Sequence, residues 1–443
     1  MQYRPLQQTD IAPLAVFRIA FGLMMTLGTL RFMLLGWIEE HYTTPLFHFH
    51  YYGFEFIEPL NLAGMYIVHA LMFAGALGIM LGAFYRWSAL TFFLTFTYTE
   101  LIDLTYYLNH YYFVSIVALV MVFLPAHRCC SVDVKRNPSI AVDTVPRWCI
   151  DVIKLQTAVV YTYAGIAKIN YEWLIEALPL RIWLPAQDTL PLIGKIMPYQ
   201  ATAYAFSWIG MLYDCTIVWW LMNSKTRPWA YASVIIFHVL TGMMFQIGIF
   251  PMVMITTTLI FFSNGFHRKL LHFFDKKITP VCAYEKALSY AQQKSRLAIA
   301  ALAAHFTFQL IFPWRFMLYH GKLFWTEQGY RFSWRVMLME KAGTATFYVQ
   351  DARTGKEGIV VNSEFLNQHQ EKQMAFQPDM ILQYAHQLKA WYESKNIPVK
   401  KIRAEVYVTL NGSRSRLYID PNADLTQLHD NWQNKNWILP FEK

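Results

Sequence analysis

Apolar residues come in long runs along this chain, most clearly over residues 14–35, 65–84, 235–262 and 297–312. A run of about 18 apolar residues or more is long enough for a helix to cross the hydrocarbon core of a membrane. The pattern therefore predicts a polytopic α-helical membrane protein with about nine transmembrane helices. We expect them at residues 11–35, 60–84, 87–102, 110 to about 124, 148–167, 203–222, 229–245, 247–262 and 297–312.

From about residue 320 the pattern changes to short alternating segments, which predict β-strands. Residues 344–350 and 357–361 flank a turn at 351–355, and residues 404–410 and 415–420 flank Asn411-Gly412, a strong hairpin signal. Residues 378–393 have the spacing of an amphipathic helix. We therefore divide the chain into a transmembrane helical domain, residues 1–319, and a small extramembrane α+β domain with two β-hairpins, residues 320–443.

Composition and charge agree with a membrane protein and add an orientation. The chain is 55% hydrophobic and only 15% charged, whereas soluble domains carry about 25% charged residues. Its net charge of +9 is concentrated in the loops 125–147, 223–228 and 264–296, which the positive-inside rule assigns to the cytoplasm. We therefore expect the N-terminus inside, nine crossings, and the C-terminal domain away from the cytoplasm. A bacterial inner membrane suits this multi-pass protein. There is no basic tract interleaved with aromatic residues, so nucleic acid is not an expected partner.

Lys168 stands at the predicted end of the fifth span, in the stretch VVYTYAGIAKINYEW. A bare ammonium in hydrocarbon costs about 2.5–3.5 kcal/mol on insertion scales. The side chain can extend to water and anchor the end of the helix. Alternatively, it can lose its proton and stay buried as a neutral base. The position of Lys168 alone allows both roles and favours the anchor.

Several histidines are further candidates for chemistry on the same outer face. Asn109-His110 begins the fourth span, where a neutral imidazole beside a basic lysine could orient that lysine or relay its proton. His238 lies within the seventh span and is a possible cavity-lining group, because ionisable residues at membrane depth often line functional cavities. His41, His48 and His50 match no standard zinc spacing, so no metal is predicted.

The segment 321–337, GKLFWTEQGYRFSWRVM, follows the last span and is rich in aromatic residues. One reading is an aromatic belt at the membrane interface. The polar groups between the rings also suit a binding wall for an amphipathic ligand.

The chain resembles the vitamin K-dependent gamma-glutamyl carboxylases and their bacterial relatives, known as horizontally transferred transmembrane-domain (HTTM) proteins. Several spaced motifs in the same order carry this resemblance. They are Thr9-Asp10-Ile11-Ala12, Leu14-Ala15-Val16-Phe17-Arg18, Met72-Phe73-Ala74-Gly75-Ala76-Leu77-Gly78, Met80-Leu81-Gly82, Tyr85-Arg86, Asn109-His110, Ala164-Gly165 with Lys168, Glu172-Trp173, Phe237-His238, Ile247-Gly248, Trp325-Thr326, Gly329-Tyr330, Ser333-Trp334 and Thr354-Gly355.

The resemblance implies a lyase-type enzyme whose co-substrates are vitamin K hydroquinone, O2 and CO2. In that family a lysine deprotonates the hydroquinone, and epoxidation of the vitamin yields a base strong enough to remove a γ-proton from a peptide glutamate. The carbanion then attacks CO2 and gives γ-carboxyglutamate. Lys168 matches the catalytic lysine, and Asn109 and His110 match its supporting residues. Trp325, Tyr330, Ser333 and Trp334 match the stretch implicated in binding the glutamate-containing peptide or protein.

Two alternatives stay open at this point. The protein could act as a quinol epoxidase or oxygenase without carboxylating a protein. It could also be a membrane transporter or scaffold, in which Lys168 is an anchor.

Overall fold

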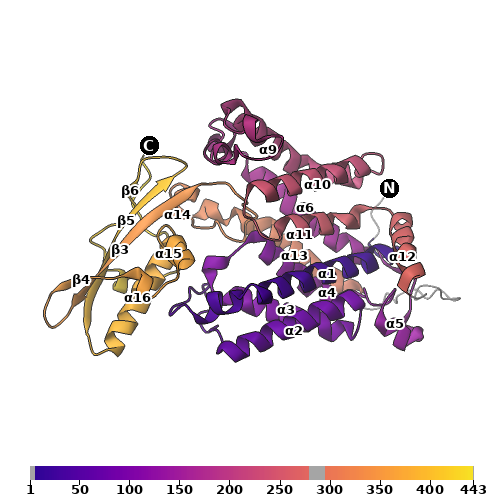
Figure 1. The fold of residues 1–443 in the computed structure, drawn as a ribbon, viewed down its shortest axis with the longest axis horizontal. Helices are drawn as coiled ribbons and strands as arrows, with labels where there is room; N and C mark the ends of the chain where they lie inside the picture. The colour runs from indigo at the N-terminus through magenta and orange to yellow at the C-terminus, as the bar shows by residue number, and fades with distance from the viewer. Residues whose placement is uncertain (1–4, 279–294, 443) are drawn as a thin grey trace.

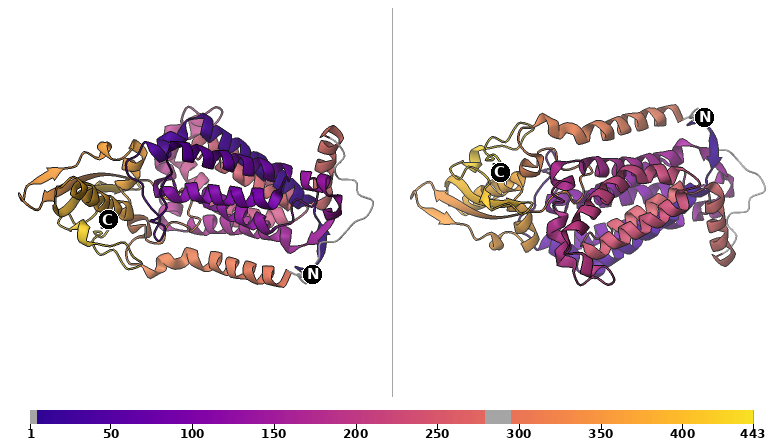
Figure 2. Two further views of the ribbon diagram at one scale, coloured as in Figure 1. Left: turned by 90° about the horizontal axis from the view of Figure 1, so that it is seen from below. Right: turned by 90° about the horizontal axis from the view of Figure 1, so that it is seen from above.

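The computed structural model describes residues 5–278 and 295–442 and consists of a helical bundle with an α+β domain at one end (Figure 1). The N-terminal strand lies at the opposite end of the bundle (Figure 2). This arrangement agrees with the predicted class, a helical membrane protein with a small sheet-containing C-terminal region.

Each of the nine ranges predicted to span the membrane contains a helix in the part of the chain that the structure describes. Within residues 5–278 and 295–442, four segments suit a membrane crossing by length and composition: Ala12–Leu34, Leu62–Leu81, Gln200–Met222 and Leu297–Leu318. Two shorter helices, Asn109–Phe123 and Phe250–Phe261, are also apolar. The structure therefore supports several spans, and nine crossings remain a prediction. The helices are α1 (Ala12–Leu34), α2 (Leu62–Leu81), α3 (Tyr85–Ile102), α4 (Asn109–Phe123), α6 (Trp148–Ala167), α9 (Gln200–Met222), α10 (Arg227–Met244), α11 (Phe250–Thr258) and α13 (Ser295–Ile311).

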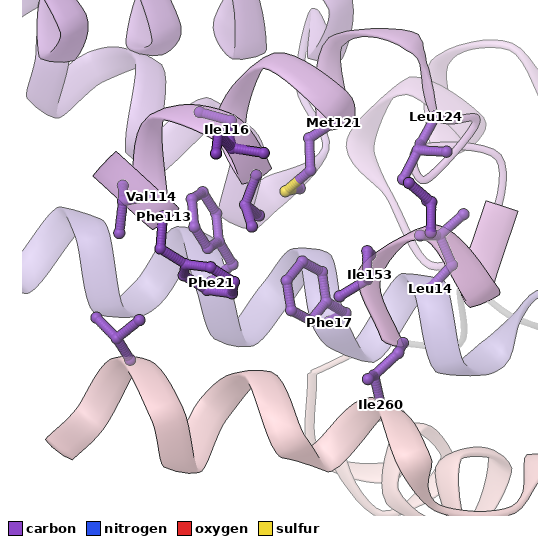
Figure 3. Close-up of a cluster of buried hydrophobic side chains, with 14 of the residues drawn as sticks. Leu14, Phe17, Phe21, Phe113, Val114, Ile116, Met121, Leu124, Ile153 and Ile260 are labelled. Atoms are coloured by element: carbon purple, nitrogen blue, oxygen red, sulfur yellow. The ribbon is translucent and has the colours of Figure 1, made fainter. Parts of the chain in front are cut away.

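The centre of the bundle is a continuous apolar core to which α1, α4, α6 and the segment after α11 contribute. Phe17 and Phe21 of α1 point toward Phe113 and Met121 of α4, with Ile153 of α6 beside them (Figure 3). At the same depth α1 and α2 approach closely, because a Cβ on Gly22 would lie 2.4 Å from the backbone nitrogen of Met80. Small residues allow this close helix packing within membranes.

Arg18 closes the core at the end of the bundle far from the α+β domain. Its side chain is fully buried and donates to the carbonyl oxygens of Ile79 (2.8 Å), Met80 (2.6 Å), Ala126 (3.1 Å) and Cys130 (2.5 Å). One guanidinium thus satisfies carbonyl groups at the end of α2 and in the loop after α4, where backbone groups lack helical partners.

Basic and polar elements gather at that same end. The strands β1 (Gln8–Asp10) and β2 (Thr144–Pro146) pair antiparallel. Helix α5 (Val132–Arg136) precedes β2 in the same loop. Helix α12 (Asn264–Ile278) lies across the end of the bundle (Figure 2), and Arg268 forms an ion pair of 2.5 Å with Asp10.

The C-terminal domain is a four-stranded antiparallel sheet in the order β4-β3-β5-β6. Its strands are β3 (Lys341–Asp351), β4 (Glu357–Ile359), β5 (Val399–Leu410) and β6 (Arg416–Leu417). Both predicted hairpins are confirmed, as is the helix expected at 378–393, which is α16 (Pro378–Ser394). The long pairing of β3 with β5, from Lys341 opposite Leu410 onward, was not anticipated. Phe347, Tyr384 and Ile402 are among the residues of its core.

Helix α15 (Gln368–Met374) joins this domain to the bundle. Gln370 is fully buried and donates through Nε2 to the Phe47 carbonyl (2.8 Å) and to Asp103 Oδ2 (2.7 Å). Asp103 follows α3, and burial raises its pKa to about 6. The contact fixes the end of the bundle from which the α+β domain projects.

Candidate functional site

Lys168 is buried at the carboxyl end of α6 rather than extended to water. Its Nζ lies 2.7 Å from Oδ2 of Asp214 on α9 and donates to the Ala164 carbonyl at 3.1 Å. The side chains of Lys168 and Asp214 are only 9% and 7% exposed. A buried ion pair depends on such a short contact, because each charge has lost its water.

The local sequence explains why the two helices come close enough for this contact. A Cβ on Gly165 would lie 2.6 Å from Sγ and 2.7 Å from the nitrogen of Cys215, so glycine is required where α6 meets α9. After Lys168 the chain turns sharply. The side chain of Asn170 accepts from the Trp173 nitrogen and begins α7 (Tyr171–Leu174). Trp173 then covers Lys168, with Nζ 5.4 Å from the centre of its ring.

The pair borders a cavity of about 100 Å³ whose lining is mostly apolar. An apolar, water-poor cavity around one lysine and one carboxylate strengthens their electrostatic interactions and protects a reactive base from water. The rings and polar groups on its wall include Tyr161, Trp173, Trp183, Phe206, Phe237, His238, Phe245 and Phe250, and Met337 lies on the wall as well.

His238 lines this cavity and is almost completely buried. Its Nε2 lies 2.8 Å from the hydroxyl of Tyr161, while its Nδ1 is buried without a hydrogen-bond partner among the described residues. The second nitrogen is therefore free to bind a ligand group that enters the cavity.

His110 lies one ring further from Lys168. The ring of Phe250 stands between the two histidines, with centres 5.3 Å from His238 and 5.6 Å from His110. His110 is buried, and its Nε2 has no partner in the described part of the chain. Phe250 lines the Lys168 cavity, whereas His110 is not among its lining residues.

Asn109 holds the segment that follows the last helix of the bundle against the start of α4. Its Nδ2 donates to the Arg335 carbonyl at 2.9 Å, and its Oδ1 accepts from the Tyr107 hydroxyl at 3.1 Å. The same hydroxyl accepts from the Phe332 nitrogen at 2.8 Å. Asn109 and Tyr107 together position the aromatic segment that the sequence singled out.

Residues 329–337 of that segment, which spans 321–337, form part of the wall of three cavities. Arg331 and Phe332 face a cavity of about 550 Å³, Ser333 and Arg335 face one of about 740 Å³, and Met337 faces the Lys168 cavity. The backbone is left-handed at Phe332, Trp334 and Met337, with φ of 58°, 57° and 53°. Such strain is uncommon outside glycine and tends to occur at functional sites. In this segment the left-handed residues lie where neighbouring side chains face different cavities.

The other predicted peptide-binding residues are distributed over this region. Trp334 is fully buried and stacks on Tyr112 of α4, with ring centres 4.9 Å apart. Tyr330 packs against Phe324. Trp325 lies in the core of the α+β domain, where Nε1 donates to the Leu439 carbonyl at 2.8 Å. Of Trp325, Tyr330, Ser333 and Trp334, Ser333 lines one of the three cavities.

Asp214 is the functional candidate that the sequence analysis missed. It is the only charged residue between positions 200 and 222, and a lone acid within a predicted span is itself a signal of a functional cavity. The histidines at 41, 48 and 50 serve other contacts: His41 stacks on Tyr106 at 4.0 Å and His48 lies 3.6 Å from Asp103. Among the described residues, no group of three or more His, Cys, Asp or Glu side chains could hold a metal ion.

These features define a helical membrane protein with a small sheet-containing C-terminal domain and a buried lysine–carboxylate pair in an apolar cavity. Comparison with known families agrees. A family model described as HTTM domain matches residues 4–266, and a second, described as vitamin K-dependent gamma-carboxylase, lumenal domain, matches residues 294–443. The chain belongs to the vitamin K-dependent gamma-carboxylase family. No solved structure matches it.

Proposed function

We propose that this protein is a vitamin K-dependent gamma-carboxylase that couples epoxidation of reduced vitamin K to the carboxylation of peptide glutamate. Membership of the family supports an enzyme that acts on glutamate-containing protein substrates. The observation that carries the proposal is the buried contact of 2.7 Å between Lys168 and Asp214 in an apolar cavity. A lysine that served only as a membrane anchor would reach water instead.

The chemical character of the cavity wall suits the flat, apolar ring of a quinol. Rings of Trp173, Phe237 and Phe250 line it, while Lys168 and His238 provide polar groups on the same wall. Small-molecule sites commonly combine apolar walls with a few polar groups that fix orientation. Reduced vitamin K, together with O2, supplies the oxidation and the strong base that removal of a glutamate γ-proton requires, and CO2 supplies the new carboxyl group.

In our proposal Lys168 accepts the first proton, and Asp214 prepares it to do so. The pair shares one proton between Nζ and Oδ2. When Asp214 takes that proton, Nζ becomes a free amine and both partners are neutral, which the apolar cavity favours over two charges. The amine then accepts the proton of a quinol hydroxyl. The final state is an ammonium beside a carboxylic acid, with the negative charge on the quinol oxygen.

His238 and the pair Asn109–His110 have supporting parts in this proposal. His238 keeps its unpartnered Nδ1 toward a ligand because Tyr161 occupies Nε2. His110 supports the site through Phe250. Asn109 positions residues 333–337, some of which line the Lys168 cavity and others the larger cavity.

The proposed membrane topology follows from the charge pattern. With the basic loops inside, all nine helices cross, and Lys168, Asn109 and the α+β domain share the outer side. In the structure Glu172, which follows Lys168 and α6, pairs with Lys322 at the start of the C-terminal region. Lys168 and the C-terminal domain therefore lie at one end of the bundle, which is compatible with this topology.

The test is an assay of the purified full chain with reduced vitamin K, labelled CO2 and a glutamate peptide, in which epoxide and fixed label are measured separately. We expect both products. Epoxide without fixed label would replace the carboxylase with a quinol oxygenase. Neither product, from protein shown to be folded, would refute both enzymes and favour a transporter or scaffold.

A further inference from the structure

Arg335 lies on the wall of the largest of the three cavities and has no anionic partner among the residues that the structure describes. This cavity, about 740 Å³, lies between the end of α6 and the chain that follows η8 (Phe312–Leu318). Its charged lining residues are Glu172, Lys322 and Arg335. Two cations and one carboxylate leave the lining with an excess of one positive charge.

The other two charges satisfy each other. Lys322 Nζ forms an ion pair with Glu172 Oε1, and the second carboxylate oxygen of Glu172 accepts from Asn411 Nδ2 at 3.1 Å. Glu172 therefore has a partner for each oxygen, and both partners, Lys322 and Asn411, belong to the C-terminal region. The excess positive charge is that of Arg335.

The guanidinium of Arg335 donates no hydrogen bond and forms no ion pair within residues 5–278 and 295–442. Its Nε is sealed from solvent without an acceptor. Its contact is with the ring of Phe316, whose centre lies 4.4 Å from Cζ. Burial lowers the pKa of Arg335, but a guanidinium stays protonated in proteins. The buried Nε donor is costly to leave unpaired. The planar fork of the guanidinium matches a carboxylate.

The backbone of Arg335 is fixed close to the reacting cavity. Its carbonyl accepts from Asn109, and Val336 and Met337, the next two residues, line the cavity of Lys168. Ser333, two residues earlier, faces the same large cavity as Arg335. An anion held by Arg335 would therefore lie next to the Lys168 site.

We propose that Arg335 binds the carboxylate of an acidic side chain in the peptide substrate and that the 740 Å³ cavity is the peptide's docking site. This inference rests on the proposed carboxylase function. A single excess positive charge matches one carboxylate, and the wall includes Phe441 and Leu323 from the extramembrane side, where a peptide arrives. Arg335 acts as a specificity-determining residue and takes no part in the proton transfers.

The test uses the full chain in lipid nanodiscs and two probes, N-acetyl-Ala-Glu-Ala-amide and its Gln counterpart. We expect the wild type to bind the Glu probe at least ten-fold more tightly than the Gln probe. Arg335→Gln should abolish that preference. Arg335→Lys, which keeps the charge but loses the fork, should retain part of it. Arg353→Gln is the matched control, because Arg353 is exposed on the β3–β4 turn, and it should bind as the wild type does.

Epoxide formation without peptide, measured on the same samples, separates this inference from the proposed function. A folded Arg335→Gln protein that keeps the Glu preference would overturn the inference even if epoxide is formed. If Arg335→Gln fails to fold, unaltered Glu preference in Arg335→Lys would overturn it in the same way. Anionic lipid could also co-purify with the wild type and be lost from Arg335→Gln whether or not a peptide probe is present. That result would identify a lipid phosphate as the occupant of the cavity and would overturn the inference.

Discussion

Nζ of Lys168 lies 2.7 Å from Oδ2 of Asp214, and the two residues come from different helices of the bundle. The contact joins the end of α6 to the middle of α9 and is nearly sealed from solvent. A buried pair of this kind adds little stability over a well-packed apolar pair, because the loss of water offsets the attraction. A chemical role therefore explains the pair better than a contribution to folding does.

Asp214→Asn tests whether the carboxylate takes the lysine's proton. Asparagine keeps the shape and a hydrogen-bond acceptor for Nζ but has no site for the proton. We expect epoxide formation to fall at least ten-fold between pH 7 and 9, measured as initial rates with reduced vitamin K in excess. A carboxylate that merely held Lys168 in its charged form would give the opposite result, because its removal would then leave activity at pH 7 equal or higher.

Arg18→Gln should destabilise the bundle without a direct effect on chemistry. The substitution leaves several of the four carbonyl acceptors of Arg18 unpaired in a buried place. We expect a loss of about 3 kcal/mol or more, observed as a lower thermal unfolding temperature in detergent. Arg31→Gln on the same helix is the control, since Arg31 is exposed and packs on Trp37. Equal unfolding temperatures for the two variants would refute this role for Arg18.

The ion pair between Arg331 and Asp379 predicts a pH dependence in the α+β domain. Burial alone would raise the pKa of Asp379, but the charge of Arg331 outweighs it and lowers this pKa to about 2. An unfolded aspartate has a pKa of about 3.9. The pair therefore contributes its full stability, about 2–3 kcal/mol, above about pH 5, and the contribution is lost as the pH falls toward 2.

Thermal unfolding of the full chain, followed from pH 7 to pH 3, measures this contribution. We expect Asp379→Asn to unfold at a lower temperature than the wild type at pH 7, with the difference shrinking as the pH falls. A difference that stays constant over this range would show that the charge of Asp379 is not responsible.

Asn109→Ala should affect the peptide more than the quinol. Without the bond from Nδ2 to the Arg335 carbonyl, residues 333–337 lose their fixed position beside the large cavity. We expect the KM for a glutamate peptide to rise about ten-fold, with a smaller change in epoxide formation without peptide. Abolished epoxide formation in a folded variant would instead place Asn109 in the quinol chemistry itself.

Sequence reasoning predicted the elements better than their contacts. Each of the nine predicted apolar ranges contains a helix among the described residues, and Asn411-Gly412 located a hairpin, because these signals are local. The pairing of β3 with β5 joins Lys341 to Leu410 across a long insertion that contains α15 and α16. No local pattern encodes such a pairing.

The site shows the same division between local and tertiary information. Lys168 and His238 were recognisable because ionisable groups are rare in apolar helices. The partnership of Lys168 with Asp214 depends on the close approach at Gly165, which only the packed helices reveal. The unpartnered guanidinium of Arg335 is equally invisible in the sequence, because it depends on which acceptors the fold leaves out of reach.

The most direct test of the account is epoxide formation by Lys168→Ala, measured with and without a small primary amine. We expect no detectable epoxide from the folded variant, because no other amine borders the cavity in the part of the chain that the structure describes. Addition of the amine should restore part of the rate, increasing with the concentration of its unprotonated form. Epoxide formation by Lys168→Ala at the wild-type rate would contradict the assignment of Lys168 as the base.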